Sequence, residues 1–197
     1  MKLYYSPGAC SLAVHIALRE AGRDFDLARV DLSTHKLSDG SDYRAISPRG
    51  YVPLLELDDG SRHTEANALL QFVADSAGQL PAPGSRERLE VTGWLAFVST
   101  ELHKTLGWLW RPDLPEAMKG IVLEVVGRRL KELDTRLSQQ EWLTGGFSVA
   151  DAYCFTVLGW TKVLSVDLSP YPDVQKYLVR VAARPAVVAA LKAEGLI

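Results

Sequence analysis

A short segment rich in proline and glycine, residues 79–85, divides this sequence into two parts of different character. It reads Gln-Leu-Pro-Ala-Pro-Gly-Ser, and since proline lacks a backbone N–H and glycine favours turns, neither a helix nor a strand is expected to run through it. Before it, short apolar runs alternate with helical patterns, whereas every long segment after it has helical periodicity. The sequence therefore predicts two domains, residues 1–78 and 86–197, joined by a linker.

The first part predicts a βαβ unit followed by a ββα unit. Ser6-Pro7-Gly8-Ala9 separates a short aromatic run from a helical pattern, and Asp58-Asp59-Gly60 is typical of a β-hairpin turn. Because βαβ crossovers are right-handed in nearly all proteins, the first two strands are expected to be parallel. We expect strands at residues 2–5, 25–32, 54–57 and 61–64 and helices at residues 10–20 and 65–77.

The second part predicts an all-α domain, a helical bundle. The pattern that begins at Val149 is apolar on nearly all sides, so we expect it to form the buried central helix. Ser148 and Asp151 have the spacing of a capping box, in which the carboxylate accepts a hydrogen bond from the backbone at the helix start. The helical patterns cover residues 86–107, 114–140, 149–165, 170–183 and 185–194.

Composition and charge argue against several classes of protein. The 197 residues include 22 Lys and Arg against 24 Asp and Glu, a net charge of −2 without the basic excess typical of nucleic-acid binding. No apolar stretch has the length of a membrane span, and Ser6-Pro7-Gly8 interrupts the start before a signal-peptide core develops. The cysteines form no CxxC pair, and the histidines lack metal-ligand spacing. We therefore expect a cytoplasmic protein with reduced thiols, and no metal, nucleic-acid or membrane partner.

Cys10 lies where the Pro7-Gly8 turn meets the first helix. Unpaired backbone N–H groups and the helix dipole at such a position favour an anion, and therefore a thiolate. Cys10 is thus either a reactive thiol or a small residue buried at a tight turn. Cys154, within the apolar helix, is expected to be inert packing.

Val52-Pro53 follows Gly50 and enters a strand directly after a turn, where cis peptide bonds tend to occur. An exposed strand end can pair with an extended peptide, and the helix start at Glu65 and Ala66 could receive the amine and carboxylate of that peptide. The alternative is an ordinary turn proline and an ordinary first-turn glutamate.

His103 lies on the first helix after the linker, and the pKa of an unperturbed histidine suits hydrogen bonding to a thiol or proton exchange. Trp108, Trp110 and Arg111 follow closely and add aromatic surface. A histidine with a structural role and tryptophans that belong to the core are the alternative interpretation.

Together these residues resemble the bacterial beta-class glutathione S-transferases, and the similarity runs the length of the chain. Five ordered matches at compatible spacing carry it: residues 2–12, Val52-Pro53-Leu54-Leu55, Thr64-Glu65-Ala66, Glu101-Leu102-His103-Lys104 and residues 147–153.

The resemblance implies a thioredoxin-like first domain, an all-helical second domain and a homodimer that binds reduced glutathione in a cleft between the domains. It implies catalytic roles for Cys10 and His103 beside the glutathione sulfur, which would attack a hydrophobic electrophile, and side activities as a thiol reductase or peroxidase. Glutathione-binding residues implied in this way are Tyr5, Ser11, His35, Lys36, Val52, Pro53, Glu65 and Ala66. The candidate electrophile pocket contains Trp108, Trp110, Arg111 and Trp160.

Three positions depart from the family pattern. Ala66 stands where the family often has serine, His35 where a lysine often reaches the glycine carboxylate, and Ala96 where an asparagine can reach across the dimer. These departures motivate an alternative, a non-catalytic binding or regulatory protein with the same fold. A dithiol oxidoreductase is excluded because Ala13 occupies the position of the second cysteine. Detoxification, degradation of an aromatic compound and redox maintenance all stay open as the physiological role.

Overall fold

The computed structural model describes residues 1–197, and the chain divides into two compact units. The first unit combines Met1–Leu80 with Pro185–Ile197, and the second is Pro81–Arg184. The break near residue 80 lies in the segment where we expected the linker. The sequence-based division assigned all of residues 86–197 to the helical domain, whereas residues 185–197 belong to the first unit.

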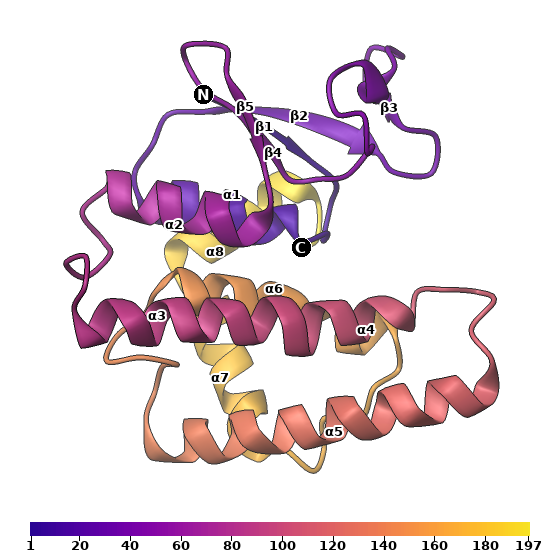
Figure 1. The fold of residues 1–197 in the computed structure, drawn as a ribbon, viewed down its shortest axis with the longest axis vertical. Helices are drawn as coiled ribbons and strands as arrows, with labels where there is room; N and C mark the ends of the chain where they lie inside the picture. The colour runs from indigo at the N-terminus through magenta and orange to yellow at the C-terminus, as the bar shows by residue number, and fades with distance from the viewer. The chain divides into compact units, whose positions relative to one another are not determined.

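The first unit contains a five-stranded sheet in the order β3-β2-β1-β4-β5 (Figure 1). β1 and β2 are parallel, with Lys2 opposite Asp26, and α1 is the crossover between them. The other neighbouring strands are antiparallel. This confirms the expected βαβ-ββα order. The strands are β1 (Lys2–Tyr5), β2 (Asp26–Asp31), β3 (Lys36–Leu37), β4 (Leu54–Glu56) and β5 (Arg62–Thr64), and the first two helices are α1 (Ser11–Glu20) and α2 (Ala66–Ser76).

Two short elements between residues 33 and 47 were not predicted, β3 and the 3-10 helix η1 (Tyr43–Ala45). A strand of two residues has no period-2 pattern to detect. Main-chain bonds hold the segment instead, and the N–H of Tyr43 donates to the carbonyl of His35 at 2.8 Å.

Side chains of β1 point alternately to the two faces of the sheet. Leu3 is fully buried, and Tyr5 packs beside His15 of α1, so this face is covered by helices. On the opposite face Tyr4 lies against Tyr43 with ring centroids 5.6 Å apart, and a second apolar cluster surrounds the pair. Both faces of the sheet are therefore covered.

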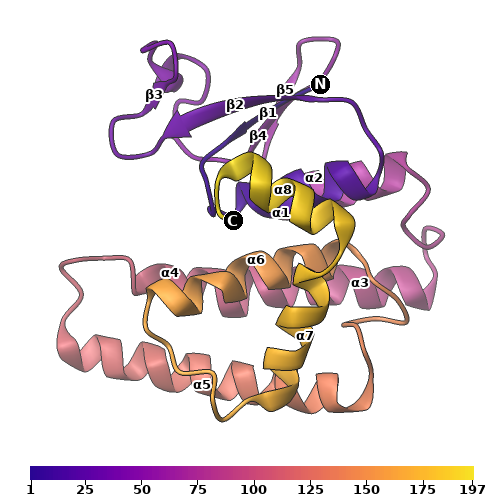
Figure 2. The same ribbon diagram turned by 180° about the vertical axis from the view of Figure 1, so that it is seen from behind.

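Helix α8 (Pro185–Glu194) packs beside α1, as the view from behind shows (Figure 2). The buried carboxylate of Glu194 lies 2.8 Å from Nδ1 of His15 and accepts a hydrogen bond from the backbone N–H of Gly8 at 2.9 Å. On the other side of the ring, Nε of Arg19 donates to Nε2 of His15 at 2.8 Å. The two bonds of Glu194, together with the buried residues Val187 and Ala190, attach α8 to the first unit.

The second unit is entirely helical. Its helices are α3 (Arg86–Phe97), α4 (Lys104–Trp108), α5 (Glu116–Gln139), α6 (Val149–Val163) and α7 (Pro172–Ala182). α6 is buried along most of its length, as its apolar sequence predicted. The capping box is also confirmed, because the N–H of Ser148 donates to Asp151 at 2.8 Å and the Ser148 hydroxyl caps the first turn. None of the helices is both long and apolar enough to cross a lipid bilayer.

The single helix predicted over residues 86–107 is interrupted by a π-helical segment, η2 (Val98–His103), between α3 and α4. The N–H of Lys104 donates to the carbonyl of Ser99, five residues earlier instead of four. The apolar pattern did not reveal this because Val98, Leu102 and Leu106 all stay buried through the change of pitch.

We predict that Glu194→Ala lowers the free energy of unfolding of the first unit by about 3 kcal/mol, since it removes the shared acceptor of a buried polar cluster. Unfolding in urea, followed by circular dichroism, measures the change. Lys192→Ala, at an exposed position of the same helix, is the control and should change stability by less than about 0.5 kcal/mol. Equal stabilities for the two variants would contradict the structural importance of Glu194.

Candidate functional sites of the two units

Cys10 lies immediately before α1 and contacts Val52 across the unit. Its half-buried thiol donates to the backbone carbonyl of Val52, with an Sγ–O distance of 3.2 Å. Cys10 has helical backbone angles, and no side chain caps the start of α1. The structure thus brings together the two segments that the sequence singled out, at a helix N-terminus whose dipole favours a negatively charged sulfur.

Ser11 stabilises the turn that carries Cys10. Its buried hydroxyl accepts from the N–H of Ser6 at 3.2 Å and donates to the carbonyl of the same residue at 3.3 Å. The N–H of Ala9 also donates to the carbonyl of Ser6, at 3.0 Å. Ser11 therefore holds the turn closed, a structural role that sequence reasoning missed. Its contact with glutathione stays a prediction.

Tyr5 is buried between the sheet and its covering helices. The ring lies 6.2 Å from that of His15, and burial together with the negative charge of Glu194 raises the pKa of the phenol. Tyr5 is therefore a neutral phenol at physiological pH. The structure defines its place in the core, and its role toward glutathione stays a prediction.

The peptide bond between Val52 and Pro53 is cis, as predicted. The backbone just before it is held by Tyr43, whose hydroxyl donates to the carbonyl of Tyr51 at 2.9 Å. Burial raises the pKa of Tyr43 to about 12, so this donor keeps its proton at neutral pH. Sequence reasoning missed Tyr43, although it is the only aromatic residue in the polar stretch from 33 to 47.

Glu65 and Ala66 stand at the start of α2, where the sequence placed a recognition site for charged peptide ends. Glu65 has φ +72°, and its side chain does not cap the helix. The first backbone N–H groups of α2 therefore have no capping oxygen from this residue. The exposed carboxylate of Glu65 pairs instead with Arg49 at 2.9 Å. The geometry combines an anion-binding helix end with an accessible carboxylate beside it.

His35 and Lys36 were alternatives for a contact to a carboxylate. Lys36 is exposed in β3. His35 has φ +55°, and its buried Nδ1 has no hydrogen-bond partner in the protein. Its ring lies against Gly50, where a Cβ atom would come within 2.5 Å of Nδ1. The structure therefore presents His35 as a ring held close to the backbone that leads to Val52.

In the helical unit, His103 belongs to an aromatic group formed with α6. Its Nδ1 lies 2.6 Å from the hydroxyl of Tyr153, and its ring meets that of Trp160 edge-on with centroids 4.8 Å apart. The ring of Trp110 meets that of Trp160 edge-on, with centroids 6.4 Å apart. Three of the predicted residues are thus brought together, and Tyr153 joins them as a residue whose contact the sequence did not predict.

Trp108 and Arg111 form a separate pair. The guanidinium carbon of Arg111 lies 5.3 Å from the centre of the Trp108 ring, and the guanidinium bonds Asp113 at 3.0 Å. The Asp113 carboxylate raises the pKa of Arg111, which stays cationic. About half of the Trp108 and Trp110 side-chain surface is exposed, at 45% and 49%. Both tryptophans thus offer accessible aromatic surface.

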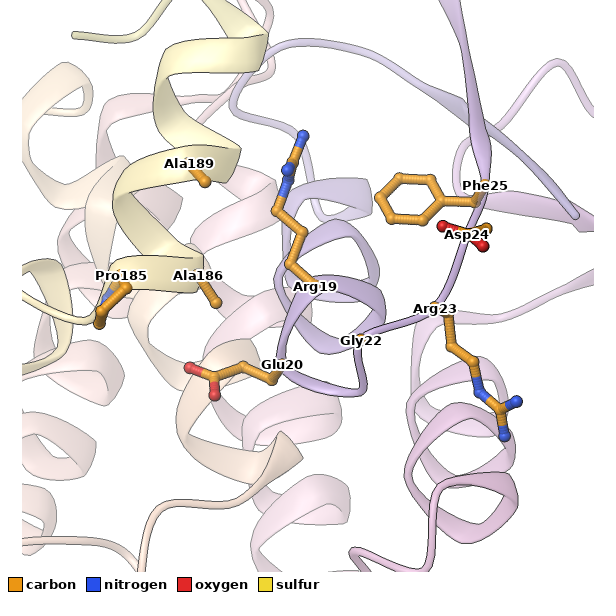
Figure 3. A pocket seen from close by; sticks show the side chains of 9 residues that line it. All are labelled: Arg19, Glu20, Gly22, Arg23, Asp24, Phe25, Pro185, Ala186 and Ala189. Carbon is orange, nitrogen blue, oxygen red and sulfur yellow. The ribbon is translucent and has the colours of Figure 1, made fainter.

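Other groups can be placed outside these sites. Cys154 is fully buried, and burial raises the pKa of its thiol, which confirms that it is inert packing. No group of three or more His, Cys, Asp or Glu side chains is arranged to hold a metal ion. A surface hollow of about 540 Å³ lies between the end of α1 and the start of α8 and includes Arg19 and Phe25, but none of the predicted glutathione-binding residues (Figure 3).

Comparison with known proteins agrees with this geometry. The family model of the glutathione S-transferase N-terminal domain matches residues 8–76, and that of the C-terminal domain matches residues 92–185. Glutathione S-transferase GstA of Escherichia coli O157:H7 is 46% identical over 200 residues, which cover 100% of both chains.

Two solved structures are also similar over 100% of both chains. A sphingomonad glutathione S-transferase in complex with glutathione is 43% identical with a TM-score of 0.93, and the bacterial beta class enzyme of Sphingomonas chungbukensis is 44% identical with a TM-score of 0.94. The chain therefore belongs to the glutathione S-transferase family, with a thioredoxin-like first domain and a helical second domain.

We predict that Gly50→Ala lowers the free energy of unfolding by about 2 kcal/mol, because the new methyl group meets the His35 ring at a position with φ +68°. Gly60→Ala is a matched control, since Gly60 has φ +81° but open space around it. It should cost only about 1 kcal/mol, the part due to backbone conformation. Denaturant unfolding measures the free energy of unfolding of both variants. Equal losses of stability would show that the His35 ring moves aside without cost.

Proposed function

We propose that this protein is a beta-class glutathione transferase in which Cys10 and the start of α1 stabilise the glutathione thiolate. The observation that carries this is the contact between Cys10 Sγ and the Val52 carbonyl, which places a thiol, a helix N-terminus and an extended backbone segment together. Glutathione is an acidic, extended peptide with a reactive thiol, and each of its parts finds a matching group here.

The peptide is held mainly by backbone groups. Val52, before Pro53, pairs with the main chain of the cysteinyl residue as an added strand would. The γ-glutamyl end meets Glu65, which takes the amine, and the N–H groups at Ala66, which take the carboxylate. Tyr5 and Ser11 are further glutathione-binding residues, and Ser11 also supports the turn that carries Cys10. His35 or Lys36 provides the positive charge for the glycine carboxylate.

The reaction uses glutathione as cosubstrate. The bound thiol releases its proton to solvent water, the sulfur attacks the electrophilic carbon, and a C–S bond forms as electrons move onto the leaving or accepting group of the electrophile. Donors aimed at the sulfur lower the pKa of the thiol, and holding both reactants together supplies much of the rate. His103 is one such donor. The electrophile contacts the aromatic residues Trp108, Trp110 and Trp160 together with Arg111.

Cys10 adds a second activity, thiol–disulfide exchange. Its thiolate attacks a disulfide, one sulfur leaves as a thiolate, and glutathione resolves the mixed disulfide that remains. The protein is further proposed to be a cytoplasmic homodimer with a role in detoxification. Sedimentation that gave only the mass of one chain, 21.7 kDa, would contradict the dimer.

The first test of the proposed function is calorimetric titration of the full chain with reduced glutathione at neutral pH. We expect saturable binding of about one glutathione per chain, with a Kd between about 1 μM and 1 mM. If no heat of binding is detected at several temperatures, the departures at Ala66, His35 and Ala96 have removed the site, and the non-catalytic alternative takes its place.

We predict that Cys10→Ala abolishes disulfide exchange but leaves conjugation within about tenfold of the wild-type rate, because glutathione supplies its own nucleophile. Cys10→Ser is the control for the hydrogen bond, since its hydroxyl can also donate to the Val52 carbonyl. Conjugation of a chromogenic aryl halide and reduction of a glutathione mixed disulfide are measured for each variant. Full disulfide exchange by Cys10→Ala would remove Cys10 from that reaction.

We predict that Ala66→Ser tightens glutathione binding by roughly three- to tenfold, the effect of one added hydrogen bond to a charged group. The new serine hydroxyl would donate to the γ-glutamyl carboxylate, which the backbone N–H groups at the start of α2 already bind. Ala68→Ser is the matched control, because Ala68 lies in the same helical turn but is exposed. Calorimetry gives both affinities, and equal gains at the two positions would argue against a carboxylate at the start of α2.

A further inference from the structure

His103 is oriented by an irregular piece of helix. It is the last residue of η2, and the bond from the Lys104 N–H to the Ser99 carbonyl widens this turn by one residue. Leu102 and Leu106 stay fully buried on either side of it. The wider turn therefore keeps the apolar side of the helix in the core while the His103 ring meets α6.

The His103 ring makes a short polar contact with Tyr153. This tyrosine is 2% exposed, and its hydroxyl oxygen lies 2.6 Å from Nδ1 of His103. N–H donors hold oxygen acceptors at about 2.7–3.2 Å, whereas hydroxyl donors approach oxygen acceptors to about 2.5–3.0 Å. The short distance favours the tyrosine as the donor and Nδ1 as the acceptor.

Ring packing restricts His103 further. Trp160 meets the imidazole at 75° with centroids 4.8 Å apart, and the Tyr153 ring meets it at 88° with centroids 5.7 Å apart. Trp160 follows Tyr153 by seven residues, so both contacts come from the same side of α6. Tyr153 and Trp160, both from one buried helix, thus restrict the ring by a hydrogen bond and by edge contacts.

We propose that Tyr153 is a positioning residue that selects the tautomer of His103. By donating to Nδ1, its hydroxyl holds the neutral imidazole with its hydrogen on Nε2, since a neutral ring has one donor and one acceptor nitrogen. His103 then acts through an N–H group and not through a lone pair. This inference rests on the proposed function, in which the N–H donates to the glutathione sulfur and favours its thiolate.

The consequence for the reaction is specific. In the opposite tautomer, Nε2 would carry a lone pair, which an anionic sulfur repels. His103 could then act only as a base. With Tyr153 in place, the donor exists before glutathione binds, so no reorganisation of the ring is needed when the thiolate forms. Tyr153 thus acts through His103 and does not itself need to touch the substrate.

The first experiment uses the protein without glutathione. Nitrogen-15 NMR of the histidine rings distinguishes a protonated from an unprotonated ring nitrogen, and His103→Gln identifies the His103 signals by their absence. We expect the wild-type His103 to carry its hydrogen on Nε2, and Tyr153→Phe to give averaged signals from both tautomers. A wild-type ring protonated on Nδ1, or a Tyr153→Phe spectrum equal to that of the wild type, would overturn the inference.

The second experiment measures conjugation kinetics in the full-length enzyme. Tyr153→Phe should lower kcat about tenfold, the effect of a weakened donor to a charged group, with the KM for glutathione within about twofold. Tyr171→Phe is the matched control, because its hydroxyl bonds the Gly127 carbonyl at 3.2 Å in the same unit, and its kcat should not change. Equal kcat values for Tyr153→Phe and the wild type would overturn the inference.

The two experiments separate this inference from the function it rests on. If the wild type has the Nε2 tautomer but does not conjugate glutathione, the tautomer assignment holds and the proposed function fails. Should Tyr153→Phe not fold, the spectrum of the wild-type ring still decides the assignment.

Discussion

The buried carboxylate of Glu194 is the interaction on which the first unit depends. It connects a helix at the end of the chain with the His15 ring in α1 and with the N–H of Gly8, two residues before Cys10. Burying the Glu194 carboxylate without hydrogen-bond partners would cost free energy, so the burial of α8 depends on the positions of the other two segments. Because the turn at Gly8 leads directly into the start of α1, the same interaction supports the position of the Cys10 thiol.

The candidate sites of the two units are built by different means. In the first unit, backbone groups dominate, since the helix starts at Cys10 and Glu65 have no side-chain caps and Val52 contributes its main chain. In the second unit, side chains on one helix, α6, orient a side chain on the neighbouring helical segment. Backbone sites tolerate changes in residue type, whereas the His103 group depends on the identity of each aromatic residue.

Local signals in the sequence predicted most of the fold and part of the site. Proline and glycine positions marked the linker and turns, and apolar periodicity found all of the longer elements. Cys10 and Val52, which the structure brings into contact, were singled out because a cysteine at a helix start and a proline at a strand start are visible within a few residues. The contact between His103 and Tyr153 joins residues 50 positions apart, and no local pattern encodes it. The placement of α8 was missed for a similar reason, since a short, mostly apolar helix does not reveal which core it joins.

The assignment of α8 to the first unit makes the helical unit an insertion within the sequence of the other. The core built by residues 1–80 is completed by the carboxylate of Glu194, which lies more than one hundred residues further along the sequence. The helical unit is contiguous and has no such dependence. The unit that carries Cys10 is therefore completed by a segment that is distant in sequence, and the Cys10 thiol has its full environment only when both segments are folded together.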